Sequence, residues 1–198
     1  MNIRASQREK GRIDGFTLIE VLVSVSIFSM VMLISTGAVF SIVEANKKTH
    51  SLKSVMTNLN FALESMMREI RVGRSYSCNG GGDCETLGGT TFTFKANRDI
   101  NGSGGYDSSD RMEYAFDSAN GSITRQILGG GPNGNATPVR ITASEIVIES
   151  MKFYVLGTGT SDKKQPKVVI TVQGHSGVGS TRSDFNIQTT VSQRPIDS

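Results

Sequence analysis

One carboxylate, Glu20, lies in an otherwise apolar segment of the chain. Between Phe16 and Val43 no other side chain is ionisable. About 20 residues of helix, at roughly 1.5 Å per residue, cross the hydrocarbon core of a membrane, so this segment is predicted to be a membrane-spanning helix. An ionisable group inside a membrane is costly, which makes Glu20 a candidate functional residue.

The segment before the apolar run is polar and basic. Residues 1–15 hold four of the 21 Lys and Arg residues but only two of the 18 Asp and Glu residues. A secretory signal peptide would have a small-residue cleavage site after its apolar core, and no such site follows Val43. Cleavage between Gly15 and Phe16 would instead remove a short basic leader and retain the apolar helix. A simple signal anchor is the alternative.

The residues from Gly15 to Glu20, Gly-Phe-Thr-Leu-Ile-Glu, resemble the prepilin peptidase site of type IV pilins and type II secretion pseudopilins. The resemblance implies that a prepilin peptidase removes residues 1–15 and that Phe16 becomes the N-methylated first residue. It also implies that Glu20 meets the Phe16 amine of a neighbouring subunit in the membrane. The pairing is physically reasonable, because a buried carboxylate and a buried ammonium each cost several kcal/mol alone.

The same resemblance implies the location and the partners. The basic leader favours a cytoplasmic N-terminus and an exported C-terminal domain, anchored by one pass in the bacterial cytoplasmic membrane and later part of a pilus or pseudopilus. Other major and minor pilin-like subunits are the expected partners. Nucleic-acid binding is not expected, because outside the leader the charges nearly balance and show no extended basic cluster.

A second helical segment follows the apolar run. From residue 44 to residue 72 there is no glycine or proline, and apolar residues recur at three-and-four spacing from Leu52 to Ile70. Gly73 is a plausible stop signal. The predicted organisation is therefore a leader (1–15), a transmembrane half of a stem helix (16–43), an amphipathic half (44–73) and a β-rich globular domain (74–198).

The composition after Gly73 is typical of strands and turns. Strands with alternating apolar residues are predicted at residues 91–95, 111–116, 122–128, 145–156, 166–173 and 185–191, with a bulge near Glu149. A one-faced sheet and a one-striped helix must bury each other. The predicted fold class is therefore α+β and pilin-like, with a long N-terminal helix packed on an antiparallel β-sheet.

Two cysteines, Cys78 and Cys84, flank a glycine-rich loop. Their spacing does not fit a redox C-x-x-C motif, and two cysteines without further ligands are too few for a structural zinc site. Outside the cytoplasm a local disulfide is expected, and two free thiols are the alternative.

A candidate calcium loop occupies residues 99–110. Asp99, Asn101, Asp107 and Asp110 place oxygen ligands at spacings that resemble an EF-hand, but the last position is Asp rather than Glu and no amphipathic helix flanks the loop. An ordinary hairpin loop is the favoured alternative. No other cofactor is expected.

The sequence gives little support for catalysis. The two histidines, His50 and His175, have no nucleophile or carboxylate pair beside them in the sequence. His175 and Ser176 are predicted to lie in a glycine-rich loop. No catalytic residue is assigned, and the chain is not expected to be an enzyme.

A second, looser resemblance points to a subtype. The Met-x-Arg-x-x-Arg pattern from Met66 to Arg71 and the Gln-Pro pair at Gln165 resemble J-type (W-type) minor pilins. This implies a minor pilin or pseudopilin that works near the filament tip and helps to initiate assembly. The alternatives are a tip-displayed adhesin, a DNA-binding pilin or a major filament subunit.

Overall fold

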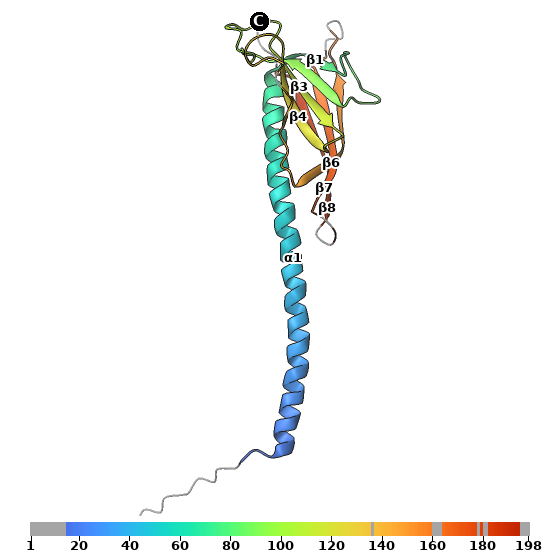
Figure 1. The fold of residues 1–198 in the computed structure, drawn as a ribbon. Coiled ribbons are helices and arrows are strands. Elements are labelled where there is room, and N and C mark those ends of the chain that lie inside the picture. The colour runs from blue at the N-terminus through green and yellow to red at the C-terminus, as the bar shows by residue number, and fades with distance from the viewer. Residues whose placement is uncertain (1–14, 136, 160–163, 178, 180–181, 195–198) are drawn as a thin grey trace, which may run out of the picture. The chain divides into compact units, whose positions relative to one another are not determined.

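The computed structural model describes residues 15–135, 137–159, 164–177, 179 and 182–194. The chain forms two compact units, Met1–Ala45 and Asn46–Ser198. One helix, α1 (Leu18–Val72), contributes to both units, and the strands all belong to the second (Figure 1). Residues 1–14 of the expected leader lie outside the described part of the chain.

In the second unit, α1 buries one stripe of side chains. The buried residues follow the three-and-four spacing of an amphipathic helix and include Leu59, Met66 and Ile70, each with no exposed surface. Apart from the exposed Phe61, the other face is largely polar, and Arg68 pairs there with Glu64 one turn earlier at 3.2 Å. The predicted apolar stripe is therefore part of the domain core, and Leu52 and Met56, toward its N-terminal end, are partly buried.

The strands form two antiparallel sheets (Figure 1). The five-stranded sheet has the order β1-β2-β3-β4-β5, and the three-stranded sheet has the order β6-β7-β8. The bounds are β1 (Arg74–Cys78), β2 (Thr91–Lys95), β3 (Arg111–Asp117), β4 (Ser122–Leu128), β5 (Val139–Arg140), β6 (Ile146–Leu156), β7 (Lys167–Ser176) and β8 (Ser183–Ser192).

Aromatic side chains join the two sheets in the core. Phe92 of β2 stacks on Phe153 of β6 with ring centroids 5.5 Å apart, and it also stacks on Phe94. The backbones of Gly89 and Phe153 exchange two hydrogen bonds of 2.8 Å. Both sheets therefore share one core with the buried stripe of α1.

The α+β fold with a long N-terminal helix and antiparallel strands is confirmed. The predicted bulge near Glu149 is also confirmed, because the β6–β7 register shifts between Ile148 and Ser150. The expectation of one sheet was incomplete, since two are present. β1 and β5 were not predicted: β1 contains an irregularity with Ser75 at positive φ, and β5 has only two residues.

The prediction that His175 and Ser176 lie in a loop was wrong. Both residues belong to β7, where His175 pairs with Val147 on one side and Asp184 on the other. The preceding glycine, Gly174, suggested a loop, but it is needed for packing within the sheet. Its α-carbon faces Ile148 and Phe185, and a Cβ added there would collide with the carbonyl oxygen of Val147.

Replacing Gly174 with alanine should therefore destabilise the β-unit. Overpacking of this kind typically costs about 1–3 kcal/mol of unfolding free energy. The measurement is the thermal unfolding of the full-length protein in detergent, followed by circular dichroism. Gly130→Ala is the matched control, because a Cβ at Gly130 meets nothing within 4 Å. Equal melting of the two variants would contradict the assignment of Gly174 to a tightly packed strand.

Candidate functional site

The predicted processing site lies directly before the start of α1. Gly15 and Phe16 have no regular secondary structure, and 80% of the Phe16 surface is exposed. Thr17 caps the helix, because its carbonyl oxygen and Oγ1 accept the N–H of Glu20 at 3.1 and 3.4 Å. The Thr-x-x-Glu spacing is the sequence signal for such a cap, and the cap was not among the predicted features.

Glu20 lies in the first turn of α1 and is exposed. The N-terminal end of a helix carries partial positive charge, so a carboxylate is favourable there. Within the described residues Glu20 forms no ion pair, because the salt bridges found there all lie from Glu64 onward. Its carboxylate is therefore available to a group from another molecule.

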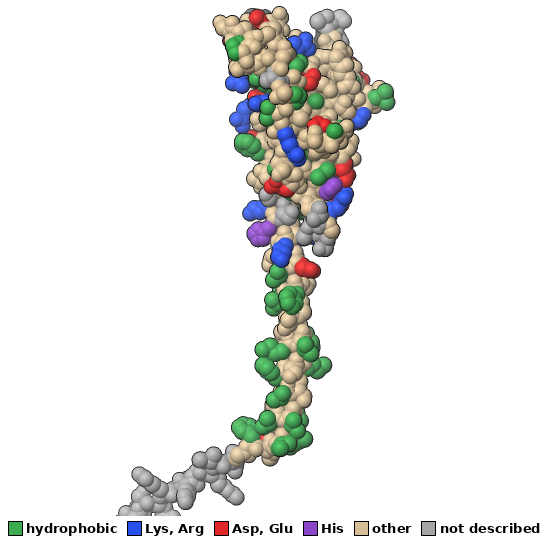
Figure 2. Space-filling model, viewed as in Figure 1, with side chains coloured by type: hydrophobic (Ala, Val, Ile, Leu, Met, Phe, Trp, Pro, Cys, Tyr) green, Lys and Arg blue, Asp and Glu red, His purple; other side chains and the backbone are tan. Residues whose placement is uncertain are grey.

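The N-terminal half of α1 exposes apolar side chains, green in Figure 2. The helix is long and apolar enough to cross a membrane by its length and composition. Three of its hydroxyl groups bond within the helix, since Ser24, Ser26 and Thr36 each donate to the carbonyl oxygen four residues earlier at 2.8 Å. A lipid environment demands such internal hydrogen bonds, because it offers no water to polar groups.

Residues 11–36 match the family described as the prokaryotic N-terminal methylation motif. The match includes the site between Gly15 and Phe16 and the carboxylate of Glu20. No curated protein and no solved structure matches the chain. The motif, together with a membrane-capable helix and the α+β fold, supports a type IV pilin or pseudopilin that is processed by a prepilin peptidase, anchored in a membrane and assembled with other subunits.

The structure joins Cys78 and Cys84 in a disulfide. The loop between β1 and β2 is also fastened to β6, because the Cys84 N–H donates to the Val155 carbonyl at 2.9 Å. The Asp83 carboxylate accepts the N–H groups of Gly157 and Thr158 at 3.0 and 2.9 Å. The disulfide therefore closes a loop that is also held against β6 and the residues after it by hydrogen bonds of Asp83 and Cys84.

The four candidate calcium ligands lie in the loop between β2 and β3, and each accepts hydrogen bonds from that loop. Asp110, whose side chain has no exposed surface, accepts the N–H groups of Ile100 and Asp107 at 2.9 and 2.8 Å. Asp99 accepts the N–H groups of Gly102 and Gly104, Asn101 accepts that of Ser103, and Asp107 accepts that of Ser109.

These contacts are typical of Asx turns, in which a side-chain oxygen organises the backbone just after it. In the described part of the chain, no three His, Cys, Asp or Glu side chains are grouped so that they could hold a metal ion. Calcium binding by Asp99, Asn101, Asp107 and Asp110 stays a prediction that requires a direct binding measurement.

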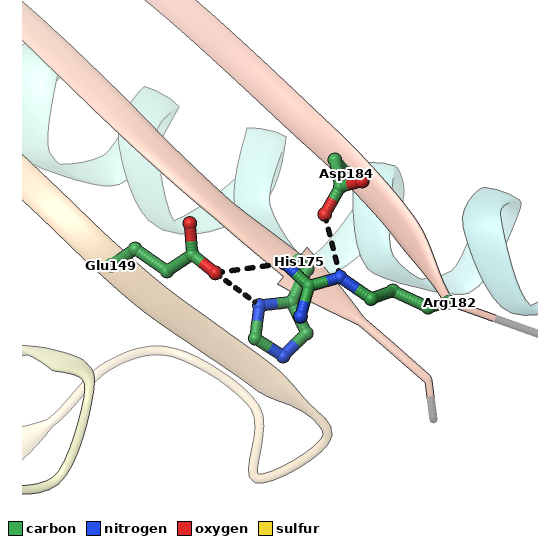
Figure 3. A network of polar contacts seen from close by, with 4 residues as sticks. All are labelled: Glu149, His175, Arg182 and Asp184. Atoms are coloured by element: carbon green, nitrogen blue, oxygen red, sulfur yellow. Dashed lines mark hydrogen bonds and ion pairs between the residues drawn. The ribbon is translucent and has the colours of Figure 1, made fainter. Parts of the chain in front are cut away.

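The structure forms a polar cluster that the sequence analysis had not found (Figure 3). Oε1 of Glu149 lies 2.8 Å from Nδ1 of His175 and 2.9 Å from Nη2 of Arg182, and Nε of Arg182 donates to Asp184 at 2.9 Å. Glu149 sits in the β6 bulge, so the cluster ties the bulge to β7 and β8. These contacts assign it a structural role, and they bring no nucleophilic side chain to His175.

Acid should weaken the β2–β3 loop. The hydrogen bond from the Asp107 N–H is the largest influence on Asp110 and lowers its pKa, as do the bonds from Ile100 and Asn101. A carboxyl group with a lowered pKa stabilises the fold above its unfolded pKa of about 4, and this contribution is lost as the pH falls through the folded value. Asp110→Asn should therefore unfold at lower temperature than the wild type at pH 7, with a smaller difference at pH 3.

The measurement is thermal unfolding of the full-length protein in detergent between pH 7 and pH 3. Asp184→Asn is the control, since Asp184 is exposed and its described side-chain contact is with Arg182 alone. Parallel pH profiles for wild type and Asp110→Asn would contradict the prediction. Repeating the pH 7 measurement with added CaCl2 tests the calcium prediction, because calcium bound to the folded state raises the unfolding temperature.

Proposed function

We propose that the protein is a minor pilin or pseudopilin that enters a type IV pilus or type II secretion pseudopilus near its tip and helps to initiate assembly. The match of residues 11–36 to the methylation motif, which includes the Gly15–Phe16 bond, is the observation that carries the filament-subunit part of this proposal. The minor-subunit part is supported by the resemblance of residues 66–71 and of the Gln165-Pro166 pair to J-type minor pilins.

The proposed mechanism is mechanical rather than chemical. Prepilin peptidase cuts after Gly15, and Phe16 becomes a methylated N-terminal ammonium. Residues 16–43 keep the processed subunit in the membrane until assembly. There the Glu20 carboxylate pairs with the ammonium of an adjacent subunit, because each charge alone is costly in lipid. The pair fixes the axial register of one stem helix against the next.

Processing predicts a defined N-terminus. The protein extracted from membranes of a peptidase-competent host should begin at N-methylated Phe16, as measured by intact mass and by the mass of the N-terminal peptide. The same chain from a host without the peptidase is the control and should retain Met1. An intact Met1 in the competent host would overturn the proposed pathway and leave a single-pass anchored domain.

Glu20→Ala should impair incorporation into filaments and leave the β-unit folded. The variant removes the only ionisable group between residues 16 and 43. The measurement is the amount of protein in sheared filaments relative to membranes, by immunoblot. Glu44→Ala is the matched control, because Glu44 lies on the same helix just beyond the apolar segment. Normal incorporation of Glu20→Ala would contradict the role of this carboxylate.

A further inference from the structure

A cleft of about 420 Å³ lies beside the last turns of α1. Its lining includes Arg68 and Glu69 of α1, Phe94 of β2, and Arg98, Ile100 and Met112. We call it the Arg98 cleft. A smaller cleft of about 220 Å³ shares Arg98, Ile100 and Met112 and extends to Arg125. Volumes of this size match sites that hold a small ligand or a few side chains.

The floor and the rim of the Arg98 cleft differ in chemistry. Phe94, Ile100 and Met112 form an apolar floor, with 1%, 8% and 3% of their surfaces exposed. The guanidinium groups of Arg68 and Arg98 stand at the rim, with 77% and 72% of their side chains exposed. An occupant that fits both parts has an apolar group next to an anionic group.

The one carboxylate of the lining, Glu69, is already held in place. Its Oε2 accepts the Tyr114 hydroxyl at 2.6 Å. Burial is the main cause of a raised pKa for Tyr114, and the hydrogen bond to Glu69 adds to it, so the phenol stays protonated and keeps donating. Glu69 is thereby fixed as an acceptor at the wall of the cleft.

Arg98 and Arg125 lie near Glu69 without closing a hydrogen bond. Their Nη atoms are 3.7 and 3.8 Å from Oε1 of Glu69, beyond the usual N–H···O distance. In the described part of the chain, the Arg98 side chain has no closer polar contact. Its planar fork of N–H donors therefore remains able to bind a carboxylate in the two-bond geometry that guanidinium groups favour.

The lining favours a carboxylate beside an apolar group over inorganic phosphate. Arg68, Arg98 and Arg125 provide three positive charges around the two clefts, Glu69 and Asp99 provide two negative charges, and Glu64 pairs with Arg68. Inorganic phosphate would be attracted by the arginines and repelled by the two carboxylates, and it would leave the apolar floor uncovered.

We propose that the Arg98 cleft binds an acidic segment of a neighbouring polypeptide, with an apolar side chain on the floor and an adjacent carboxylate at Arg98. This inference rests on the proposed function, in which the chain assembles beside other subunits, and it names the chemistry of one contact. The complementary surface on the neighbour carries Asp or Glu next to a large apolar residue.

The test uses the full-length protein in a neutral detergent and a fluorescein-labelled peptide, acetyl-Gly-Glu-Leu-Glu-Gly, with fluorescence anisotropy as the readout. The peptide should bind saturably, and its affinity should fall as NaCl is raised. Arg98→Ala should weaken binding at least about tenfold, which is the effect of losing a charge-assisted hydrogen bond. Arg182→Ala is the matched control and should bind like the wild type, since Arg182 belongs to the Glu149 cluster.

Two further peptides separate the parts of the proposal. Replacing both Glu residues of the peptide with Lys, or its Leu with Ser, should each weaken binding. Absence of saturable binding, or equal binding to wild type and Arg98→Glu, would overturn the proposal. Displacement of the peptide by inorganic phosphate at constant ionic strength would also overturn it, in favour of a phosphate site. None of these results depends on the N-terminus, so the mass measurement on Phe16 tests the proposed function separately.

Discussion

Burial of one stripe of α1 is the interaction on which the rest of the β-unit depends. Leu59, Met66 and Ile70 have no exposed surface, and fully burying each such side chain contributes roughly 1.5–3 kcal/mol. The buried side chains of this stripe and of both sheets belong to one hydrophobic core, so the sheets need the helix to complete it. The position of α1 then fixes where Glu69 and Tyr114 meet, and with them the Arg98 cleft.

The same helix must satisfy two different surroundings. After residue 46 it buries a stripe and exposes ions such as Glu64 and Arg68, which suits water. Before residue 44 it exposes apolar side chains, and Ser24, Ser26 and Thr36 donate to carbonyl oxygens of the same helix, which suits lipid. An unpaired carboxylate is consistent with water and costly in lipid. Glu20 suits the partly positive N-terminal end of the helix, and its pairing with a group of a second molecule stays a proposal.

The periodicity of apolar residues predicted those helices and strands that bury one regular face. Three-and-four spacing gave the stripe of α1, and alternation gave β2, β3, β4 and the bulged β6, because burial on one face selects the apolar residues directly. The patterns failed where a neighbour decides the structure. Glycine at position 174 suggests a loop, yet the residue lies in β7. It is glycine because the backbone of Val147 leaves no room for a side chain. β5 has only two residues and carries no periodicity to detect.

The polar clusters were beyond prediction for the same reason. Tyr114 is 45 residues from Glu69, and Arg182 is 33 residues from Glu149, so only the packing of the helix and the strand register bring each pair together. The loop at Asp110 is different, because its acceptors bond to backbone within ten residues. The loop also contacts the rest of the β-unit, because Ile100 belongs to the hydrophobic core and the Asn133 N–H donates to the Asn101 carbonyl at 2.8 Å. Arg98 and Ile100 belong to this same loop, so the hydrogen bonds at Asp110 that fix its conformation also place part of the lining of the Arg98 cleft.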